Sequence, residues 1–179
     1  MTAPSLAQLD NQDSNVIFNG DRIYKHMIMH LNFTLYDLRR EMEALNPCLS
    51  NHNVMMLVSE DAPSDHPYCY AHVLGIFHAN IIYTGPGSID YLPRRVESLW
   101  VWWFDLQHRT LSWEDPTLDK GRFLLMHQPH AFGFVDPNDV LRCCHLIPSF
   151  ADGRLHSDGV ALSCEVSDGN VWRSYYVNR

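Results

Sequence analysis

The longest strand predicted for this chain runs from Tyr68 to Tyr83, and a strand of that length limits the folds open to the chain. Because successive side chains of a strand point to opposite faces, the stretch has two faces of different character. The first face is uniformly apolar and is the better candidate for a core, whereas the second is mixed and predicted to be partly exposed. The first carries Ala71, Val73, Gly75, Phe77, Ala79 and Ile81, and the second carries Tyr70, His72, Leu74, Ile76, His78 and Asn80.

Further apolar or alternating runs indicate strands elsewhere in the chain. The run Leu99–Phe104 is apolar on both faces, which is typical of a central strand. Short strands separated by turns predict a mostly β (α+β) domain, built as a small curled antiparallel sheet or barrel without a parallel α/β pattern. The other predicted strands cover residues 54–58, 122–126, 131–135, 140–148, 160–166 and 171–177.

An N-terminal hairpin is predicted at residues 16–24. The apolar runs 16–18 and 23–24 flank Asn19-Gly20-Asp21, and Asn-Gly supplies the left-handed residues that a tight hairpin turn needs. Residues 1–14 are polar and are predicted to be a disordered tail. Since 179 residues suit one domain, residues 15–179 are predicted to be a single β-rich domain.

One helix is predicted near residues 34–46. Its apolar residues recur at spacings of four and three, Thr34 and Asp37 fit an N-terminal capping box, and Asn46-Pro47 is a stop signal. A competing interpretation extends a strand through residues 34–38, because Phe, Thr and Tyr favour pleated structure. The helical stripe consists of Leu31, Leu35, Leu38, Met42 and Leu45.

Composition and charge exclude several classes of protein. Apolar residues make up 46% of the chain, too many for an intrinsically disordered protein. The 13 Lys and Arg against 21 Asp and Glu give a formal net charge of −8, which argues against direct nucleic-acid binding. The chain contains neither a run of about 18 apolar residues nor a signal peptide, so no membrane association is expected. The five cysteines are an odd number and lack the spacing of a disulfide framework, which predicts reduced thiols in an intracellular protein.

The 11 histidines do not form a recognisable metal or catalytic motif. In His66-x2-Cys69-x2-His72 the cysteine and the second histidine point to opposite faces of a strand, and a zinc site usually needs four ligands in paired spacings. The chain has no G-x-S-x-G elbow and no phosphate-binding loop. No catalytic residue, metal ligand or cofactor is therefore predicted. A metal-dependent hydrolase or nuclease, built from His and Asp residues gathered in space, is kept as an alternative.

Aromatic residues supply the candidate binding face. Trp100, Trp102 and Phe104 share one side of their predicted strand, so they cannot share a core with the residues between them. An exposed aromatic face usually marks the site of a partner. The candidate binding residues are Tyr70, His72, Trp100 and Trp102.

Several long motifs follow one another along residues 18–178. They are Tyr36-Asp37-Leu38-Arg39-Arg40, residues 66–80, Leu99–Phe104, residues 131–137, residues 145–150 and Tyr175-Tyr176-Val177-Asn178. In this order they resemble uncharacterised proteins of mushroom-forming fungi that are associated with Plavaka- or KDZ-type transposable elements. In that group the region lies near the C-terminus of a much longer polypeptide and continues past the last motif. The resemblance therefore implies a chain truncated at its C-terminus.

This chain departs from the pattern of that group at three positions. Cys69 stands where the group usually has Trp, and His72 and Trp102 stand where it usually has Arg. Because Arg is seldom fully buried, the resemblance implies that Tyr70, His72 and Trp102 face solvent.

The order of the strands is also similar to that of bromo-adjacent homology (BAH) modules, which are barrel-like chromatin-interaction domains. Together these features predict a non-catalytic protein-interaction module of a transposon-derived fungal protein, intracellular and acting in the nucleus on chromatin. Its partner is expected to be a protein or the remainder of a larger polypeptide, with no cofactor, direct nucleic-acid contact or membrane. An alternative is a structural fragment of a transposase-like polypeptide with no activity of its own.

Overall fold

The computed structural model describes residues 15–34, 40–49, 52–58, 66–106, 118–156 and 170–178. These residues are mostly β. Their two 3-10 helices are three residues long, so neither could cross a membrane. In chain order the elements are β1 (Val16–His26), β2 (Met29–Thr34), β3 (Arg40–Leu45), β4 (Asn53–Leu57), β5 (Tyr68–Tyr83), β6 (Arg94–Leu106), β7 (Lys120–Phe123), β8 (Phe132–Val135), η1 (Pro137–Asp139), β9 (Val140–Pro148), η2 (Phe150–Asp152) and β10 (Tyr175–Asn178).

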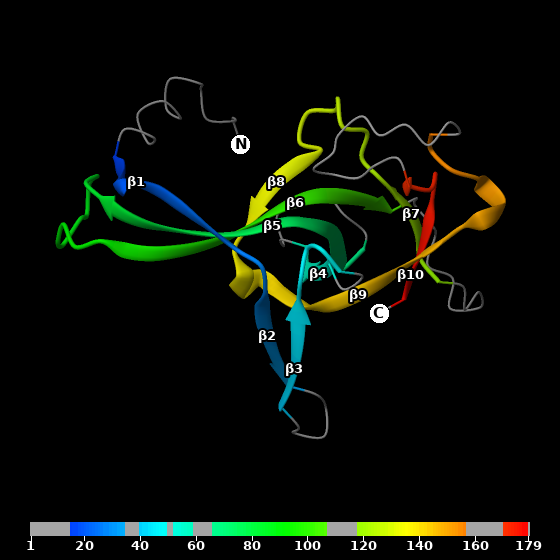
Figure 1. The fold of residues 1–179 in the computed structure, drawn as a ribbon, viewed down its shortest axis with the longest axis horizontal. Coiled ribbons are helices and arrows are strands. Elements are labelled where there is room, and N and C mark those ends of the chain that lie inside the picture. The colour runs from blue at the N-terminus through cyan, green and yellow to red at the C-terminus, as the bar shows by residue number, and fades with distance from the viewer. Residues whose placement is uncertain are drawn as a thin grey trace.

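Eight strands form one antiparallel sheet that nearly closes into a barrel (Figure 1). Its order is β1-β5-β4-β9-β10-β7-β6-β8, and an additional pairing of β5 with β6 joins six of the strands into a ring. The shortest strand pairing in the ring is that of β7 with β10, which consists of two residue pairs. The predicted curled antiparallel sheet or barrel is therefore confirmed.

Strands β5 and β6 are longer than the barrel and continue beyond it as an arm, seen at the left of Figure 1. We define the arm as β1 with residues 75–83 of β5 and 94–100 of β6, because β1 pairs with β5 from residue 76 onward. The junction is a β-bulge, where Val73 pairs with Val101 but Gly75 pairs with Trp100, so that Leu74 is an extra residue. A bulge bends its strand and shifts the alternation of its side chains by one.

The apolar side chains form two cores, one on each side of the barrel wall. All six strands of the ring contribute to the inner set, which therefore lies inside the barrel. The barrel core contains Met55, Tyr70, Trp102, Phe104, Phe123, Ala131, Cys144, Val171, Tyr175 and Val177. The outer core contains Leu31, Leu45, Val54, Met56, Ala71, Val73, Ile76, Leu99, Val101, Val135 and Cys143.

The outer core includes residues of a separate two-stranded sheet, the β2–β3 hairpin. Leu31 and Leu45 of this hairpin are buried, and the Glu43 carboxylate accepts a hydrogen bond from the backbone N–H of Cys143 at 2.8 Å. The helix predicted near residues 34–46 is therefore wrong, because residues 29–34 and 40–45 are paired strands. Met42, placed on the helical stripe with Leu45, is 64% exposed, since the hairpin presents alternate residues to the outer core.

The hairpin predicted at residues 16–24 is also wrong. Asn19-Gly20-Asp21 lies inside the single strand β1, where the pairing with β5 jumps from Phe18 to Ile23. Gly20 and Asp21 have φ of 75° and 50°, so this segment does take the left-handed conformations expected of it. They form an irregularity instead of a turn, because both halves of β1 pair with the long strand β5. The tail at 1–14 and the strand at 160–166 lie outside the described residues.

Candidate functional site

The four predicted binding residues lie on one face of β5 and β6, but most of that face is inside the barrel. His72 pairs with Trp102, and residues directly opposite one another in an antiparallel pair point to the same side. Tyr70 is 0% exposed and Trp102 is 2% exposed, while His72 is half-buried. The expectation that these residues face solvent is wrong, because the ring of strands closes over them.

Trp100 lies on the other side of the bulge, where the same face leaves the barrel. It pairs with Gly75 on β5 and with Phe134 on β8, and its ring centroid is 6.1 Å from that of Phe132. Trp100 is half-buried and lines a groove on the arm. The structure thus separates the predicted face into two sites, a barrel cavity and an arm groove.

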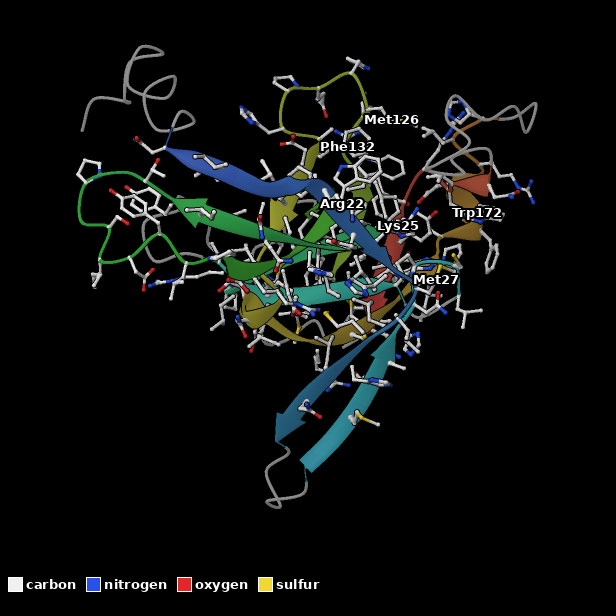
Figure 2. All side chains as sticks on the ribbon, turned by 60° about the vertical axis from the view of Figure 1, so that its left-hand side comes forward. Arg22, Lys25, Met27, Met126, Phe132 and Trp172 are labelled. Carbon is white, nitrogen blue, oxygen red and sulfur yellow. The ribbon has the colours of Figure 1, made fainter. Side chains whose placement is uncertain are left out.

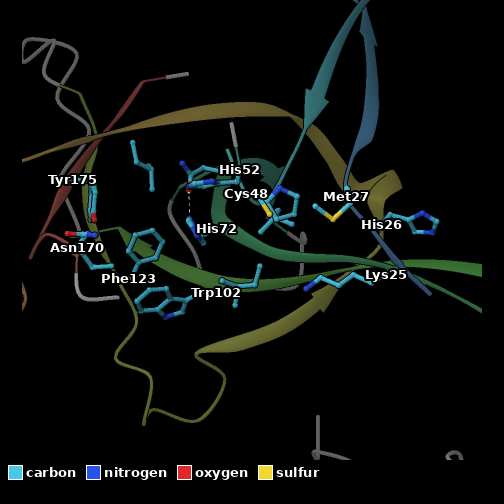
Figure 3. Close-up of a pocket in the computed structure, with 16 residues that line it drawn as sticks. Lys25, His26, Met27, Cys48, His52, His72, Trp102, Phe123, Asn170 and Tyr175 are labelled. Atoms are coloured by element: carbon cyan, nitrogen blue, oxygen red, sulfur yellow. Dashed lines mark hydrogen bonds between the residues drawn. The ribbon is translucent and has the colours of Figure 1, made fainter. Parts of the chain in front are cut away.

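The barrel cavity has a volume of about 600 Å³ and extends from Phe123 and Tyr175 at one end to Lys25 and Met27 at the other (Figure 3). One wall is aromatic: the rings of Trp102 and Phe123 stack with centroids 4.5 Å apart, and Phe123 meets Tyr175 edge to face at 5.4 Å. The Trp102 indole N–H donates to the Leu124 carbonyl at 2.7 Å, so its polar atom is satisfied.

Next to this aromatic wall lie three polar residues, Asn53, His52 and His72, and the His72 ring meets Phe123 edge to face with centroids 5.6 Å apart. Asn53 pairs with His72 across β4 and β5, and the His72 Nδ1 lies 2.9 Å from the Asn53 Oδ1. The imidazole rings of His52 and His72 meet edge to face with centroids 4.1 Å apart. Burial and then the neighbouring His52 lower the pKa of His72 to about 3, and burial lowers the pKa of His52. Both rings are therefore neutral at physiological pH.

The arm groove has a volume of about 520 Å³ and is lined almost entirely by carbon. It crosses four strands, β1, β5, β6 and β8, on the face that continues from the barrel interior. Phe134, at one edge, is 72% exposed. The main lining residues are Phe18, Ile23, Phe77, Val96, Trp100 and Phe134.

The described residues contain no group of three or more His, Cys, Asp or Glu side chains that could hold a metal ion. His66 contacts Asp119 at 3.2 Å and the Tyr68 carbonyl at 2.8 Å, whereas His72 contacts Asn53, so the two histidines of the predicted spacing belong to different networks. Burial raises the pKa of the Cys143 and Cys144 thiols to about 12, so neither is a thiolate at neutral pH.

The chain matches no protein-family model, no curated protein and no solved structure. Function is therefore inferred from the geometry of the chain itself. Sequence reasoning missed the groove residues Phe18, Ile23 and Phe134. Their apolar character was visible, but which strands would lie beside Trp100 depends on the topology. It also missed His52 and Asn53, since nothing local to residues 52–53 indicates that they meet His72.

Proposed function

We propose that this chain is a non-catalytic protein-interaction module that binds an apolar segment of its partner in the arm groove. The observation that carries the proposal is the groove itself, a concave sheet face with large apolar side chains and almost no polar surface. Monomeric proteins rarely leave such a face uncovered, and an exposed apolar patch usually marks an interaction site.

An amphipathic helix is the occupant that fits this face. Neighbouring strands lie about 4.8 Å apart, so four strands span about 14 Å, and a helix with its side chains is about 10–12 Å wide. Packing a helix on the open face of a sheet is the ordinary way to bury it, and a helix in an apolar groove is a recurring mode of peptide recognition.

The strand β1, which supplies the groove residues Phe18 and Ile23, also carries two basic residues. Arg22 and Lys25 lie on β1, and Figure 2 shows them following one another along the strand toward Met27. Within the described residues neither has an ion-pair partner, whereas Arg94 and Arg95 pair with Asp90 and Glu97. Neither cation lines the groove, since Lys25 lines the barrel cavity, but both lie on the strand that borders the groove and favour acidic residues in a partner segment that extends past it.

The source of the helix follows from the resemblance described above. A transposon-associated polypeptide that carries this module near its C-terminus would supply the helix from its own body or recruit a nuclear chromatin protein that carries one. In both cases the module contributes recognition and leaves nucleic-acid contact to other parts, in agreement with its net charge of −8.

The test compares two phenylalanines of nearly equal exposure. Phe134 in the groove is 72% exposed and Phe150, on η2, is 69% exposed. Phe134→Asp should lower recovery of the partner from nuclear extract about ten-fold, since an apolar anchor of an interface is worth about 1–2 kcal/mol, and Phe150→Asp should leave recovery unchanged. Cross-linking with mass spectrometry should place a helical segment of the partner against Trp100.

Equal recovery of the partner with both variants would show that the groove does not bind it. If the wild-type chain instead self-associates through the groove and recovers no partner, it behaves as a fragment whose apolar face lacks its cover. Size-exclusion chromatography of the wild type and of Phe134→Asp distinguishes that outcome, because the variant would then become monomeric.

A further inference from the structure

We infer that the far end of the arm holds a second anchor site for the helix bound in the arm groove, a pocket that takes one large apolar side chain such as leucine or phenylalanine. The inference rests on the proposed function, because it names what that helix must carry. The pocket, here called the tip pocket, has a volume of about 160 Å³ and lies beside the loop 84–93 that joins β5 to β6, at the left of Figure 1. A cavity of about 150 Å³ can hold one benzene ring, so the tip pocket suits a single side chain.

The tip pocket continues the arm groove along the same face of the sheet. Ile81 and Val96 line both cavities. On β5 the groove residues Phe77 and Ile81 and the pocket residue Tyr83 are separated by even numbers of positions, so their side chains point to one side. Arg94 shares that side, because it pairs with Ile81 across β5 and β6. A helix that lies along the strands in the groove therefore reaches the tip pocket with a side chain near its end.

The surface that the tip pocket offers to a partner is chiefly apolar. Its polar groups contact one another: the Ser88 hydroxyl donates to the Asp90 carbonyl oxygen at 2.7 Å, and the Asp90 carboxylate pairs with Arg94 at 3.4 Å. Two apolar side chains of the same pocket remain open, since Ile89 is 93% exposed and Leu92 is 66% exposed. Burying an apolar side chain against them removes apolar surface of both molecules from water, which is favourable.

The barrel end of the groove carries an unpaired charge on the same side of the sheet. Lys25 pairs with Phe77 across β1 and β5, so it lies on the groove side, just past the groove itself. Phe77 and Ile81 are four positions apart on β5, a rise of about 13 Å, which equals about eight or nine residues of helix. Residues eight positions apart share one stripe of a helix. The bound helix is therefore expected to carry an acidic residue beside Lys25 and the apolar anchor about eight residues away.

The direct test uses helical peptides as probes on the wild-type protein. The reference peptide is a helix of about 16 residues made of Ala, Gln and Leu, with Leu along one face and a single Glu. A second peptide adds Phe eight positions from the Glu, and a third carries the Phe two positions further along, on the opposite face of the helix. Fluorescence anisotropy should show the second peptide binding about ten-fold tighter than the other two, because its ring becomes buried. Equal binding of all three peptides, or no binding of any, overturns the inference.

Variants of the protein then locate the anchor. Leu92→Asp places a charge in the tip pocket and should abolish the ten-fold gain that the Phe of the second peptide brings. Tyr91→Asp is the matched control, because Tyr91 is the neighbouring residue and is 70% exposed but does not line the tip pocket. The gain should persist in this control. Loss of the gain in both variants, or in neither, overturns the inference.

The charge at the barrel end has its own comparison. Replacing the Glu of the second peptide by Gln should weaken binding to the wild type about three-fold, the size expected of an exposed ion pair, and should leave binding to Lys25→Gln unchanged. An equal loss with both proteins would show that the Glu does not lie beside Lys25 and would overturn the expected spacing.

Phe134→Asp separates this inference from the proposed function, which requires that the variant weaken the binding of every peptide. If it does so while the Phe brings no gain on the wild type, the groove binds the helix without an anchor at the tip, and only the inference fails. If Phe134→Asp weakens no peptide, the proposed function fails together with the inference.

Discussion

Strands β5 and β6 pass through both the barrel and the arm. The same face of the pair is buried in the barrel and open to solvent in the arm. In the barrel that face is a core: Phe104 is 6% exposed and lies against Phe123 and Tyr175. In the arm it carries residues that are just as apolar, yet Phe134, on the neighbouring strand β8, is 72% exposed. Residue type is the same in both regions, so burial is decided by whether the strands close into a ring.

The two regions also differ in what a mutation can disturb. Inside the barrel the core side chains are packed between six strands, so a change of volume or charge among them is hard to accommodate. At the arm groove four strands form an open sheet, the three strands of the arm and the neighbouring β8, and a side chain can move into the groove. Matched substitutions in the two regions should therefore separate folding from binding.

The largest difference is expected between two Phe→Ala substitutions. Phe104→Ala should lower the free energy of unfolding by about 3–5 kcal/mol, because it leaves a cavity among stacked rings. Phe134→Ala should change it by less than about 0.5 kcal/mol, because its ring is largely solvated. Urea denaturation measures both, and equal losses would show that the arm face is part of the folding core.

Acid should act on the barrel through His72. The unfolded pKa is about 6.5 and the folded pKa is about 3, so between these values the unfolded chain binds a proton that the folded chain does not. Stability is then complete above pH 6.5 and falls by about 1.4 kcal/mol per pH unit toward pH 3. His72→Phe should make the free energy of unfolding less dependent on pH. Urea denaturation curves measured at several values from pH 7 to pH 4 test this.

The matched histidine for this experiment is His78, six residues further along β5 in the arm. Its pKa is also lowered, first by desolvation and then by Arg95, but by a smaller shift. His78→Phe should therefore reduce the acid dependence less than His72→Phe does. The reverse order would mean that the arm, not the barrel, holds the buried imidazole.

Substitutions at two glycines, one in the barrel and one in the arm, test the same difference in packing. A Cβ on Gly121 in the barrel would lie 2.5 Å from the Asp105 carbonyl oxygen, and backbone cannot move aside, so Gly121→Ala should cost about 2 kcal/mol. A Cβ on Gly75 would instead meet the Phe77 ring at 2.5 Å. That ring lines the open groove and can rotate, so Gly75→Ala should cost less than about 1 kcal/mol. Thermal melts of the two variants test this, and a greater loss at Gly75 would contradict the open groove.

Local patterns predicted the strands better than they predicted the faces. The period of two marks β5 at Tyr68–Tyr83, as observed, and the division of β6 into Trp102 and Phe104 against Leu99 and Val101 is also confirmed. Alternation is a property of neighbouring residues, so it is visible without the fold. Which face becomes interior depends on ring closure between distant strands, and that information is not local.

The bulge at Leu74 explains the main error about the faces of β5. A single apolar face from Ala71 to Ile81 was expected, but one extra residue shifts the alternation. Ala71 and Val73 consequently lie in the outer core, while Ala79 and Ile81 line the arm groove. The candidate site divides at the same bulge, since His72 and Trp102 line the cavity and Trp100 lines the groove.

The last comparison concerns the hydrogen bond, here called the clamp, by which Glu43 holds the hairpin on the outer core. The Glu43 carboxylate accepts a hydrogen bond from the N–H of the buried residue Cys143, so removing the carboxylate deprives a buried backbone donor of its acceptor. Glu43→Ala should cost about 1–2 kcal/mol. Glu97→Ala in the arm removes an exposed pair with Arg95 and should cost about 0–0.5 kcal/mol. Amide exchange should also quicken in β2 and β3 of Glu43→Ala alone, because the clamp joins them to the barrel. Equal stabilities of the two variants would show that apolar contacts of Leu31 and Leu45 hold the hairpin without the carboxylate.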